Sequence, residues 1–485
     1  MTTPIPARST ATKRITLLVV CVTTAMLMLD IAVVNTALPS IAVDLDAGVS
    51  SLQWVIDAYT LALATAVLGA GSWADRRGRR RAFVVGLVWF TGASLLCALA
   101  PTIWFLDLAR AVQGIGGAVL FACSLALLAD VFDRGPARAS ALAAYGATIG
   151  GAFAVGPLVG GLLTELLDWR AIFFVNVPIG LVTLLLTLRW VPESRDPRPR
   201  AADVPGQLLA AAGLAAFVFA VLRGHEIGWS DAQPVIAFVL AVGALVAFVA
   251  HEMRTADPML PPHLLANRAF AGAQVAAFAI SASLFAVFVY TTLYLQNVLL
   301  LSPVQAGLVY LPATVAMFVV AGATAKLDRV VPTRVSLSCS LALVAVGLLM
   351  MTVAEADSSK YVLLPGLVVA CAAAGVFNPV MSGIVLGEST AAHSGLAAGI
   401  NDAFRQTGIA VGVAVLGVFL PAESLLPGGS PQDFVSGLQG ALVAAAFVAA
   451  LGTVVCAVCL RPRPQTAPVF GDAESDTVEF PAVTG

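Results

Sequence analysis

The sequence predicts an all-α polytopic membrane protein, a chain that crosses the bilayer many times as helices. Of its 485 residues, 59% are hydrophobic and only 11% are charged. Soluble domains carry about 25% charged residues, so this chain cannot cover a globule with polar surface. Apolar runs of about 20 residues, the length of a transmembrane helix, follow one another along the chain, and arginine-rich loops separate alternate pairs of runs.

The first six spans are expected within residues 15–191. They fall near 15–37, 52–71, 82–100, 104–129, 138–164 and 170–191. Three basic residues between positions 8 and 14 precede the first span. They place the N-terminal segment, residues 1–14, in the cytoplasm, because short loops rich in Lys and Arg resist export. The loop after that span holds Asp44 and Asp46 and no basic residue, so it is predicted to lie outside.

A connector with two additional spans is expected in residues 192–268, near 207–222 and 233–251. Six further spans would form a second bundle within 269–460; they lie near 270–293, 306–326, 333–354, 361–386, 395–420 and 434–460. The prediction is therefore fourteen transmembrane helices with both termini in the cytoplasm. The tail, residues 461–485, is polar and acidic and is expected to be disordered.

A charged loop joins the second and third spans and anchors this topology. It reads Gly71-Ser-Trp-Ala-Asp75-Arg76-Arg77-Gly78-Arg79-Arg80-Arg81. Five arginines in so short a loop fix it on the cytoplasmic side. The segment Ala325-Lys-Leu-Asp328-Arg329 could be a degraded copy of it in the second half. Such a repeat favours two six-helix bundles around a central cavity, a recurrent transporter architecture.

Three charged residues are predicted to lie inside the first bundle. Asp30 lies about 22 Å from the cytoplasmic edge, and Asp57 and Arg110 lie about 9 Å from the outer edge, at 1.5 Å per residue. All three therefore lie in the outer half of a hydrocarbon core about 30 Å thick. Charges inside spans default to function, and this cluster could bind a proton reversibly. The alternative is a static buried ion pair that locks the helices together.

Glycine-rich motifs mark the fourth and fifth spans. Arg110-Ala-Val-Gln113-Gly114-Ile-Gly116-Gly117 combines small residues with an arginine and a glutamine that face a polar interior. The fifth span carries Gly146-x-x-x-Gly150 and then Gly156-Pro157-Leu-Val-Gly160-Gly161. Spacings of this kind let two helix backbones approach closely, and Pro157 bends the span.

These motifs resemble those of the major facilitator superfamily, and in particular of its fourteen-span drug:proton antiporters of the multidrug efflux type. The resemblance covers nearly the whole chain. It rests on the loop pattern G-x-x-x-D-R-x-G-R-[KR]-[KR], on Leu29-Asp30-Ile-Ala-Val-Val-Asn35-Thr-Ala-Leu-Pro39, on Arg110/Gln113/Gly114, on the glycine motif of span five, on Trp169-Arg170 to Gly180, and on Tyr294-Leu-Gln296 with the residues that follow. In the motif of the first span, Ile31 and Ala32 replace the more usual Thr-Val.

The resemblance implies export of lipophilic, often cationic compounds in exchange for protons, by alternating access of two six-helix bundles. It implies that Gly71, Asp75, Arg76, Gly78 and Arg79 form a gate loop on the cytoplasmic side. The motif of span five, Gly146, Gly150, Gly156, Pro157, Gly160 and Gly161, would be the antiporter motif that limits leak. Asp30, Asp57 and Arg110 would couple transport to protons.

The candidate substrate cavity comprises Asn35, Gln113, Gln296, Asp402 and Arg405. The last two belong to the thirteenth span, about 10 Å and 15 Å from its cytoplasmic end, and so lie near the midplane, where a substrate site is expected. The alternative is a local pair at i,i+3 that neutralises itself.

Other functions fit the sequence less well. The glycine motif of span five disfavours a proton-coupled importer without excluding it, and export of an endogenous metabolite stays open. A membrane enzyme should show a paired nucleophile and base or a metal set, but none of the four histidines is spaced for ligation within a span. A sensor would need an extramembrane domain.

The resemblance and the predicted topology also indicate partners and location. The expected partners are a small lipophilic substrate, protons and the lipid bilayer, with no cofactor, metal or nucleic acid. The protein is expected to be a monomer in a bacterial cytoplasmic membrane.

Overall fold

The computed structural model describes residues 10–132, 136–195, 203–327, 331–387, 394–421 and 430–460. Within these ranges the secondary structure is helical, without strands. Most of the predicted N-terminal segment, the whole predicted tail and residues 328 and 329 of the suspected loop copy lie outside them.

The first half of the chain forms a bundle of long helices. They are α1 (Thr10–Asp44), α2 (Val49–Arg77), α3 (Arg79–Ala98), α4 (Ile103–Val131), α5 (Pro136–Leu166), the short α6 (Ala171–Phe174) and α7 (Asn176–Trp190). Within it α2 and α3 both pack on α4, and α1 packs on α5 and α7. These contacts close a bundle around α1 and α4, the helices that carry the predicted Asp30 and Arg110.

An extra helical pair follows and leads into the second bundle. The pair is α8 (Val204–Ile227) and α9 (Ala232–Glu252), with the short α10 (Pro262–Ala266) after it. The second bundle comprises α11 (Arg268–Ile280), η1 (Ser281–Phe285), α12 (Ala286–Leu293), η2 (Tyr294–Val298), α13 (Pro303–Leu327), α14 (Thr333–Met350), η3 (Met351–Val353), α15 (Leu364–Gly387), α16 (Ser394–Gly417) and α17 (Pro431–Cys459). The segments α11 to η2 form one long span with two wide π-helical turns.

Each of the fourteen predicted ranges contains a helix, but fewer are long and apolar enough to identify as spans. Among the described residues twelve helices pass that test, or thirteen if the bent α5 counts as one span. The remaining range, 395–420, is α16, which holds Asp402 and Arg405 and packs on α2, η1 and α11. Charged residues lower its apolar character, while its packing places it inside the bundle.

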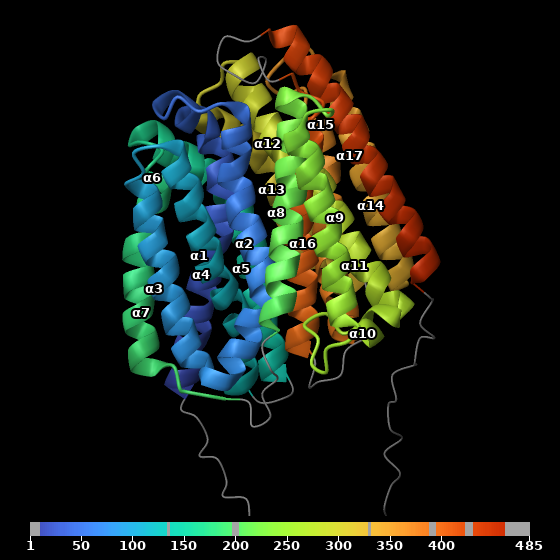
Figure 1. Cartoon of the computed structure of the whole chain (residues 1–485). Coiled ribbons are helices and arrows are strands. Elements are labelled where there is room, and N and C mark those ends of the chain that lie inside the picture. Colours follow the sequence, from blue (N-terminus) through green and yellow to red (C-terminus); the bar gives the residue numbers. More distant parts are fainter. Residues whose placement is uncertain are drawn as a thin grey trace, which may run out of the picture.

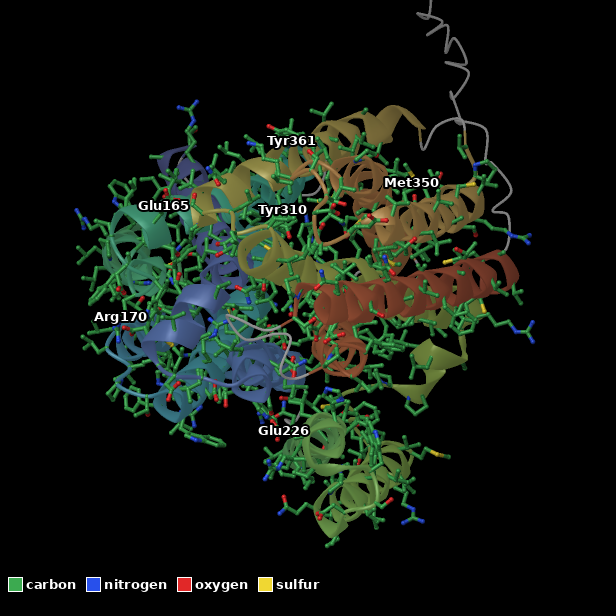
Figure 2. The ribbon with its side chains drawn as sticks, turned by 90° about the horizontal axis from the view of Figure 1, so that it is seen from above. Glu165, Arg170, Glu226, Tyr310, Met350 and Tyr361 are labelled. Atoms are coloured by element: carbon green, nitrogen blue, oxygen red, sulfur yellow. The ribbon has the colours of Figure 1, made fainter. Side chains whose placement is uncertain are left out.

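The two halves lie side by side, and the extra pair lies beside the seam between them (Figures 1 and 2). The first residues of α1 and the last of α17 lie at the same end of the molecule, and the α1–α2 connection lies at the opposite end (Figure 1). We name the latter the Asp46 end, after the residue in that connection, and the former the Gly78 end, after the residue between α2 and α3.

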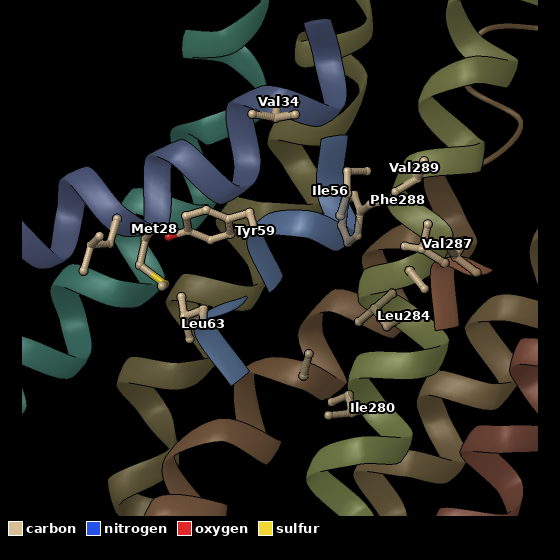
Figure 3. Close-up of a cluster of buried hydrophobic side chains, with 14 of the residues drawn as sticks. Met28, Val34, Ile56, Tyr59, Leu63, Ile280, Leu284, Val287, Phe288 and Val289 are labelled. Carbon is tan, nitrogen blue, oxygen red and sulfur yellow. The ribbon is translucent and has the colours of Figure 1, made fainter. Parts of the chain in front are cut away.

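The buried core continues from one half into the other. Met28, Tyr59 and Leu63 of the first half belong to the same apolar cluster as Leu284 and Phe288 of the second (Figure 3). Between the halves, α5 packs on α13 and α2 packs on α16. A smaller cluster joins α8 to both halves, because Val218 and Val221 belong to the same apolar cluster as Leu61 of α2 and Ala414 of α16.

Helix α5 bends by 42° between the segments 144–152 and 154–166. Pro157 explains the place of the bend, because its ring clashes with the carbonyl of the residue four positions earlier and it donates no hydrogen bond there. The bend expected from the sequence therefore occurs about one turn before the proline.

Candidate functional site

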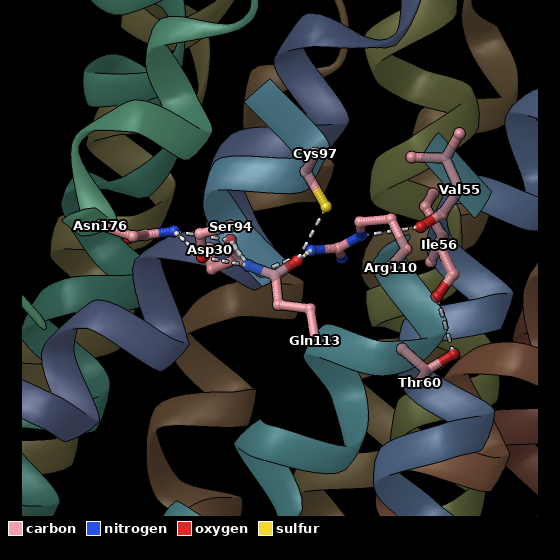
Figure 4. A network of polar contacts seen from close by, with 9 residues as sticks. All are labelled: Asp30, Val55, Ile56, Thr60, Ser94, Cys97, Arg110, Gln113 and Asn176. Atoms are coloured by element: carbon pink, nitrogen blue, oxygen red, sulfur yellow. Dashed lines mark hydrogen bonds and ion pairs between the residues drawn. The ribbon is translucent and has the colours of Figure 1, made fainter. Parts of the chain in front are cut away.

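A buried polar cluster, which we call the Asp30 cluster, joins four helices of the first half (Figure 4). Arg110 of α4 places Nη1 2.6 Å from Oδ2 of Asp30 in α1. Gln113, one turn after Arg110, donates to Asp30 Oδ1 over 2.8 Å, and Asn176 of α7 donates to the same oxygen over 2.9 Å. Gln113 also donates to Ser94 of α3 over 2.8 Å.

The Asp30 cluster has no access to solvent. Asp30 is 1% exposed, Arg110 2% and Gln113 0%. Arg110 also donates from Nε to the carbonyl of Val55, and its guanidinium lies 4.2 Å from the ring centre of Tyr59. A buried ion pair is tolerable only when further hydrogen bonds satisfy its remaining lone pairs and protons, and this one meets that condition. Asp30 and Arg110, which the sequence analysis placed at a similar depth, are therefore joined directly in one buried ion pair.

Two members of this cluster were missed as site residues. Asn176 stands in the Trp169 to Gly180 stretch that carried the family resemblance, so the sequence held a signal for it. Ser94 lies in an apolar run with no motif around it, and only its position in α3, opposite Gln113, reveals its part.

Asp57 lies apart from the Asp30 cluster. Its side chain is 0% exposed, and neither carboxylate oxygen has a hydrogen-bond partner. It interacts electrostatically with Asp107 of α4, which is 8% exposed and has an unpartnered Oδ1. The sequence analysis missed Asp107, because it stands only four residues after the start of its helix.

The predicted gate loop is almost entirely helical. Helix α2 continues to Arg77, α3 begins at Arg79, and the single residue Gly78 makes the turn with φ +107°. Arg79 forms an ion pair of 2.9 Å with Asp75 one turn earlier. The loop expected from Gly71 to Arg81 is therefore wrong, because one glycine in a conformation open to few other residues suffices to reverse the chain.

The segment after α7 holds this turn in place. The amide of Arg80 donates to Glu193 Oε1 over 3.1 Å, and the amide of Arg79 donates to the carbonyl of Ser194 over 2.9 Å. Arg76 donates to the carbonyl of Ser72 in its own helix, and Gly71 approaches Ala122 of α4. In this conformation the described contacts of the turn stay within the first half.

The glycines of α5 differ in what they approach. A Cβ on Gly160 would lie 2.9 Å from Cα of Val33, and one on Gly161 would lie 3.0 Å from Cα of Val304 in α13. A Cβ on Gly156 would collide with that of Ala32. These three glycines therefore allow α5 to touch α1 and α13 closely. Pro157 itself contributes its carbonyl to the close approach of Gly307 in α13.

Gly146 and Gly150, by contrast, make no such backbone contact. Nothing lies within 4 Å of a Cβ on Gly146, and one on Gly150 would meet only the ring of Phe318 at 3.6 Å. The close approach expected at this pair is wrong for the conformation described, because the two residues lie on the other side of the bend in α5.

The charged pair of α16 is partly accessible. Asp402 and Arg405 have side chains 28% and 27% exposed, and their ion pair is long, 3.9 Å. Tyr145 of α5 lies within electrostatic range of both, so this pair faces the first half across the seam. Asn401 donates to Gln274 of α11 over 3.2 Å. A ligand could therefore contact groups from both halves at this level.

The other predicted cavity residues are less accessible. Gln113 is sealed inside the Asp30 cluster, and Gln296 donates to the carbonyl of Thr36 over 2.9 Å. Asn35 lines a small hollow with Pro157, Phe288 and their neighbours, with room for about one water molecule.

Several hydrogen bonds close the two halves together at the Asp46 end. Gln53 of α2 donates to the hydroxyl of Tyr290 in α12 over 2.9 Å, and that hydroxyl donates to the carbonyl of Val413 in α16. The amide of Val304 donates to Glu165 over 3.0 Å. Together with the bond from Gln296 to α1, these contacts shut the seam at that end, whereas Asp402 and Arg405 keep access nearer the Gly78 end.

The described part of the chain contains no candidate metal-binding site. No group of three or more His, Cys, Asp or Glu side chains there has a geometry suited to a metal.

Two helical bundles around partly accessible charges, with an extra helical pair beside their seam, define a membrane carrier. Residues 20–413 match the model of the Major Facilitator Superfamily. The chain belongs to this superfamily, and so it is a transporter and a multi-pass membrane protein.

Curated relatives are similar over most of the chain. The multidrug resistance protein Stp of Mycobacterium tuberculosis is 35% identical over 82% of this chain and 74% of its own length. The puromycin resistance protein pur8 of Streptomyces alboniger is 36% identical over 94% and 93%, and the cephamycin export protein CmcT of Amycolatopsis lactamdurans is 35% identical over 92% of each.

Among solved structures, the crystal structure of the human organic anion transporter MFSD10 (TETRAN) resembles the fold. It aligns with a TM-score of 0.63 over 92% of this chain and 99% of that chain, at 17% identity. At that identity the likeness concerns the fold alone.

Proposed function

We propose that this protein exports small lipophilic drugs or antibiotics in exchange for protons, by alternating access of its two bundles. The observation that carries drug export is the similarity, over more than nine-tenths of both chains, to a puromycin resistance protein and a cephamycin export protein. Proton exchange draws support from acids buried in the first half, above all Asp57, whose oxygens lack partners.

The proposed substrate site lies between the bundles at Asp402 and Arg405, with Tyr145 opposite. These two side chains are about one-quarter exposed and only loosely paired. Their ion pair can therefore open to bind a ligand at small cost, whereas a sealed pair cannot. Asn35 would contribute from α1, toward the Asp46 end. Asp57 would carry the proton coupling, and the buried ion pair of Asp30 and Arg110 would hold α1 to α4 beside it rather than contact the substrate.

The proposed orientation puts the Gly78 end in the cytoplasm of a bacterial cell, with both termini on that side and the protein acting as a monomer. Its support is the positive charge at that end, because arginine-rich short loops stay inside. The turn between Asp75 and Arg79 would work as a gate element, and Gly156, Gly160 and Gly161 would limit leak. A single cysteine at position 77, an exposed residue at the end of α2, should then react with an impermeant thiol reagent in everted vesicles and not in intact cells.

Transport in proteoliposomes tests the proposed function. Vesicles loaded with a pH-sensitive dye receive puromycin, a cephamycin or a dye-like cation from outside. Exchange predicts that the internal pH rises as substrate enters, because each substrate displaces protons outward. An internal pH that falls as substrate enters would identify a symporter, and substrate movement without any pH change would refute proton coupling.

Two variants make this assay specific. Asp57→Asn should abolish the pH change, because the side chain no longer ionises. Asp433→Asn is the matched control, since it makes the same substitution at an exposed acid in the first turn of α17. Equal coupling in both variants would contradict the role of Asp57.

A further inference from the structure

Two carboxyl groups, those of Asp57 and Asp107, lie between the Asp30 cluster and the Asp46 end. Asp57 follows the start of α2 by eight residues, and Asp107 follows the start of α4 by four. The two helices begin at the same end and pack along each other. Arg110, the cation of the Asp30 cluster, lies three residues after Asp107, about 4.5 Å further along the helix axis.

Neither carboxyl group has the partners that a buried anion needs. Both oxygens of Asp57 and Oδ1 of Asp107 are buried without a hydrogen bond. Arg110 is the neighbouring cation, and it interacts electrostatically with Asp107. Its ion pair within 4 Å, among the residues that the structure describes, is with Asp30.

The remaining titratable neighbours, among the residues that the structure describes, supply no positive charge. Tyr290 of α12 interacts electrostatically with Asp57, and Cys97 of α3 with Asp107. Tyr59 of α2 faces Asp30 and Arg110. A buried carboxylate without a partner is strongly unfavourable, and the like charge of Asp107 acts on Asp57. Binding of a proton removes both penalties.

We propose that Asp107 and Asp57 form a proton-binding site that takes up its proton from the Asp46 end, and that this uptake is needed for the seam to close there. The step is the addition of one proton from the medium to a carboxylate, which becomes a neutral carboxyl group. Asp107, which is 8% exposed against 0% for Asp57, is the member nearer to solvent. This inference rests on the proposed proton exchange and adds Asp107 and the gate to it.

Closure and the proton site are linked through one face of α2. Gln53 lies one helical turn before Asp57, and it forms the bond to Tyr290 that helps to shut the seam. Closing that contact brings Tyr290 within electrostatic range of Asp57 and seals the carboxyl group from water. A charged Asp57 therefore opposes closure and a neutral one permits it. By linkage, a lower pH must favour the closed seam.

A distance measurement across the seam tests this inference without any transport. Spin labels at positions 46 and 300, in the full chain with its native cysteines replaced, report the gap at the Asp46 end in lipid nanodiscs. The closed fraction of the wild-type protein should rise as the pH falls from 9 to 5. The Asp57→Asn protein should stay closed across that range.

The variants at Asp107 identify its share. Asp107→Asn removes the like charge beside Asp57, so the midpoint of closure should move to lower pH by about one unit, a tenfold change in proton affinity. Asp107→Glu should restore the midpoint, and Asp433→Asn should leave it unchanged. Restoration by Glu separates proton binding from a merely structural role.

Two results would overturn the inference. One is a wild-type gap that does not respond to pH; the other is an Asp107→Asn midpoint equal to that of the wild type. Because neither substrate nor gradient is present, these results are independent of the proteoliposome assay. A protein that fails to exchange protons there but closes with falling pH would contradict the proposed function and leave the proton-linked gate in place.

Discussion

Removal of one charge from the Asp30 cluster should strongly destabilise the first bundle. In Asp30→Asn the new amide would face the amide donors of Gln113 and Asn176, which now share Oδ1 of the carboxylate. Arg110, 2% exposed, would lose its only anionic partner within 4 Å among the described residues. Breaking a buried pair in this way typically costs about 3–5 kcal/mol.

A double-mutant cycle measures this effect. The free energy of unfolding is followed by SDS titration in mixed micelles for Asp30→Asn, for Arg110→Gln and for the double variant. Each single change should cost about 3–5 kcal/mol. The double variant should cost less than the sum by about 2–3 kcal/mol, because the second change removes a group that the first left unpaired. Asp433→Asn, at an exposed position, should change little.

Two outcomes would refute this reasoning. Single variants that each lose under about 1 kcal/mol would show that the ion pair does not hold the helices. Single effects that add to within about 0.5 kcal/mol would show that the two charges act independently. Either result would argue against a structural role for the Asp30–Arg110 ion pair.

The remaining predictions concern packing, the turn and the connector. Gly160→Leu should cost about 1–3 kcal/mol of unfolding free energy by overpacking against α1, and should raise the proton leak of proteoliposomes, whereas an intact seal would reduce the motif to ordinary packing. Gly78→Ala should lower the melting temperature, because its φ is +107° and its Cβ would lie 2.6 Å from Glu193; an unchanged melting temperature would contradict this. Although burial raises the pKa of the Asp203 carboxyl, the hydrogen bonds that it accepts outweigh this and lower its pKa overall. The stability that Asp203 contributes is therefore present above about pH 4 and is lost as the pH falls through its lowered pKa. Asp203→Asn should remove that part of the acid sensitivity in melting curves. An unaltered dependence of the melting temperature on acid pH would argue against this.

Helix positions followed from the sequence because membranes leave few alternatives. Every backbone polar group in a bilayer must be satisfied internally, so each long apolar run had to form a helix. The depth of Asp30 and Arg110 could also be counted, since a helix rises by a fixed distance per residue. Their shared depth made a pair foreseeable, and the structure joins them at 2.6 Å.

The direction in which a side chain points around the helix axis could not be predicted in the same way. Asp57 was expected at the depth of Arg110, but Arg110 turns to Asp30 and to the carbonyl of Val55, so Asp57 stays unpartnered. Among the glycines of α5, spacing alone could not separate Gly160, where an added Cβ would collide with α1, from Gly146, where it would meet nothing within 4 Å. Such differences depend on helix rotation and on the bend before Pro157, and both arise from tertiary packing.

Two buried acids of the first half thus differ in a way that activity assays alone would conceal. Asp30 accepts hydrogen bonds from Arg110, Gln113 and Asn176, whereas Asp57 accepts none on its side chain. Neutralising either should stop transport, but for opposite reasons. Loss of the Asp30 charge leaves a buried cation unpaired and weakens the bundle, while loss of the Asp57 charge removes an unpaired anion and should stabilise the closed form. The free energy of unfolding should therefore fall in Asp30→Asn and stay the same or rise in Asp57→Asn. A fall of equal size in both variants would contradict this, because it would require Asp57 to be a charged group with a partner, and no such partner is present among the residues that the structure describes.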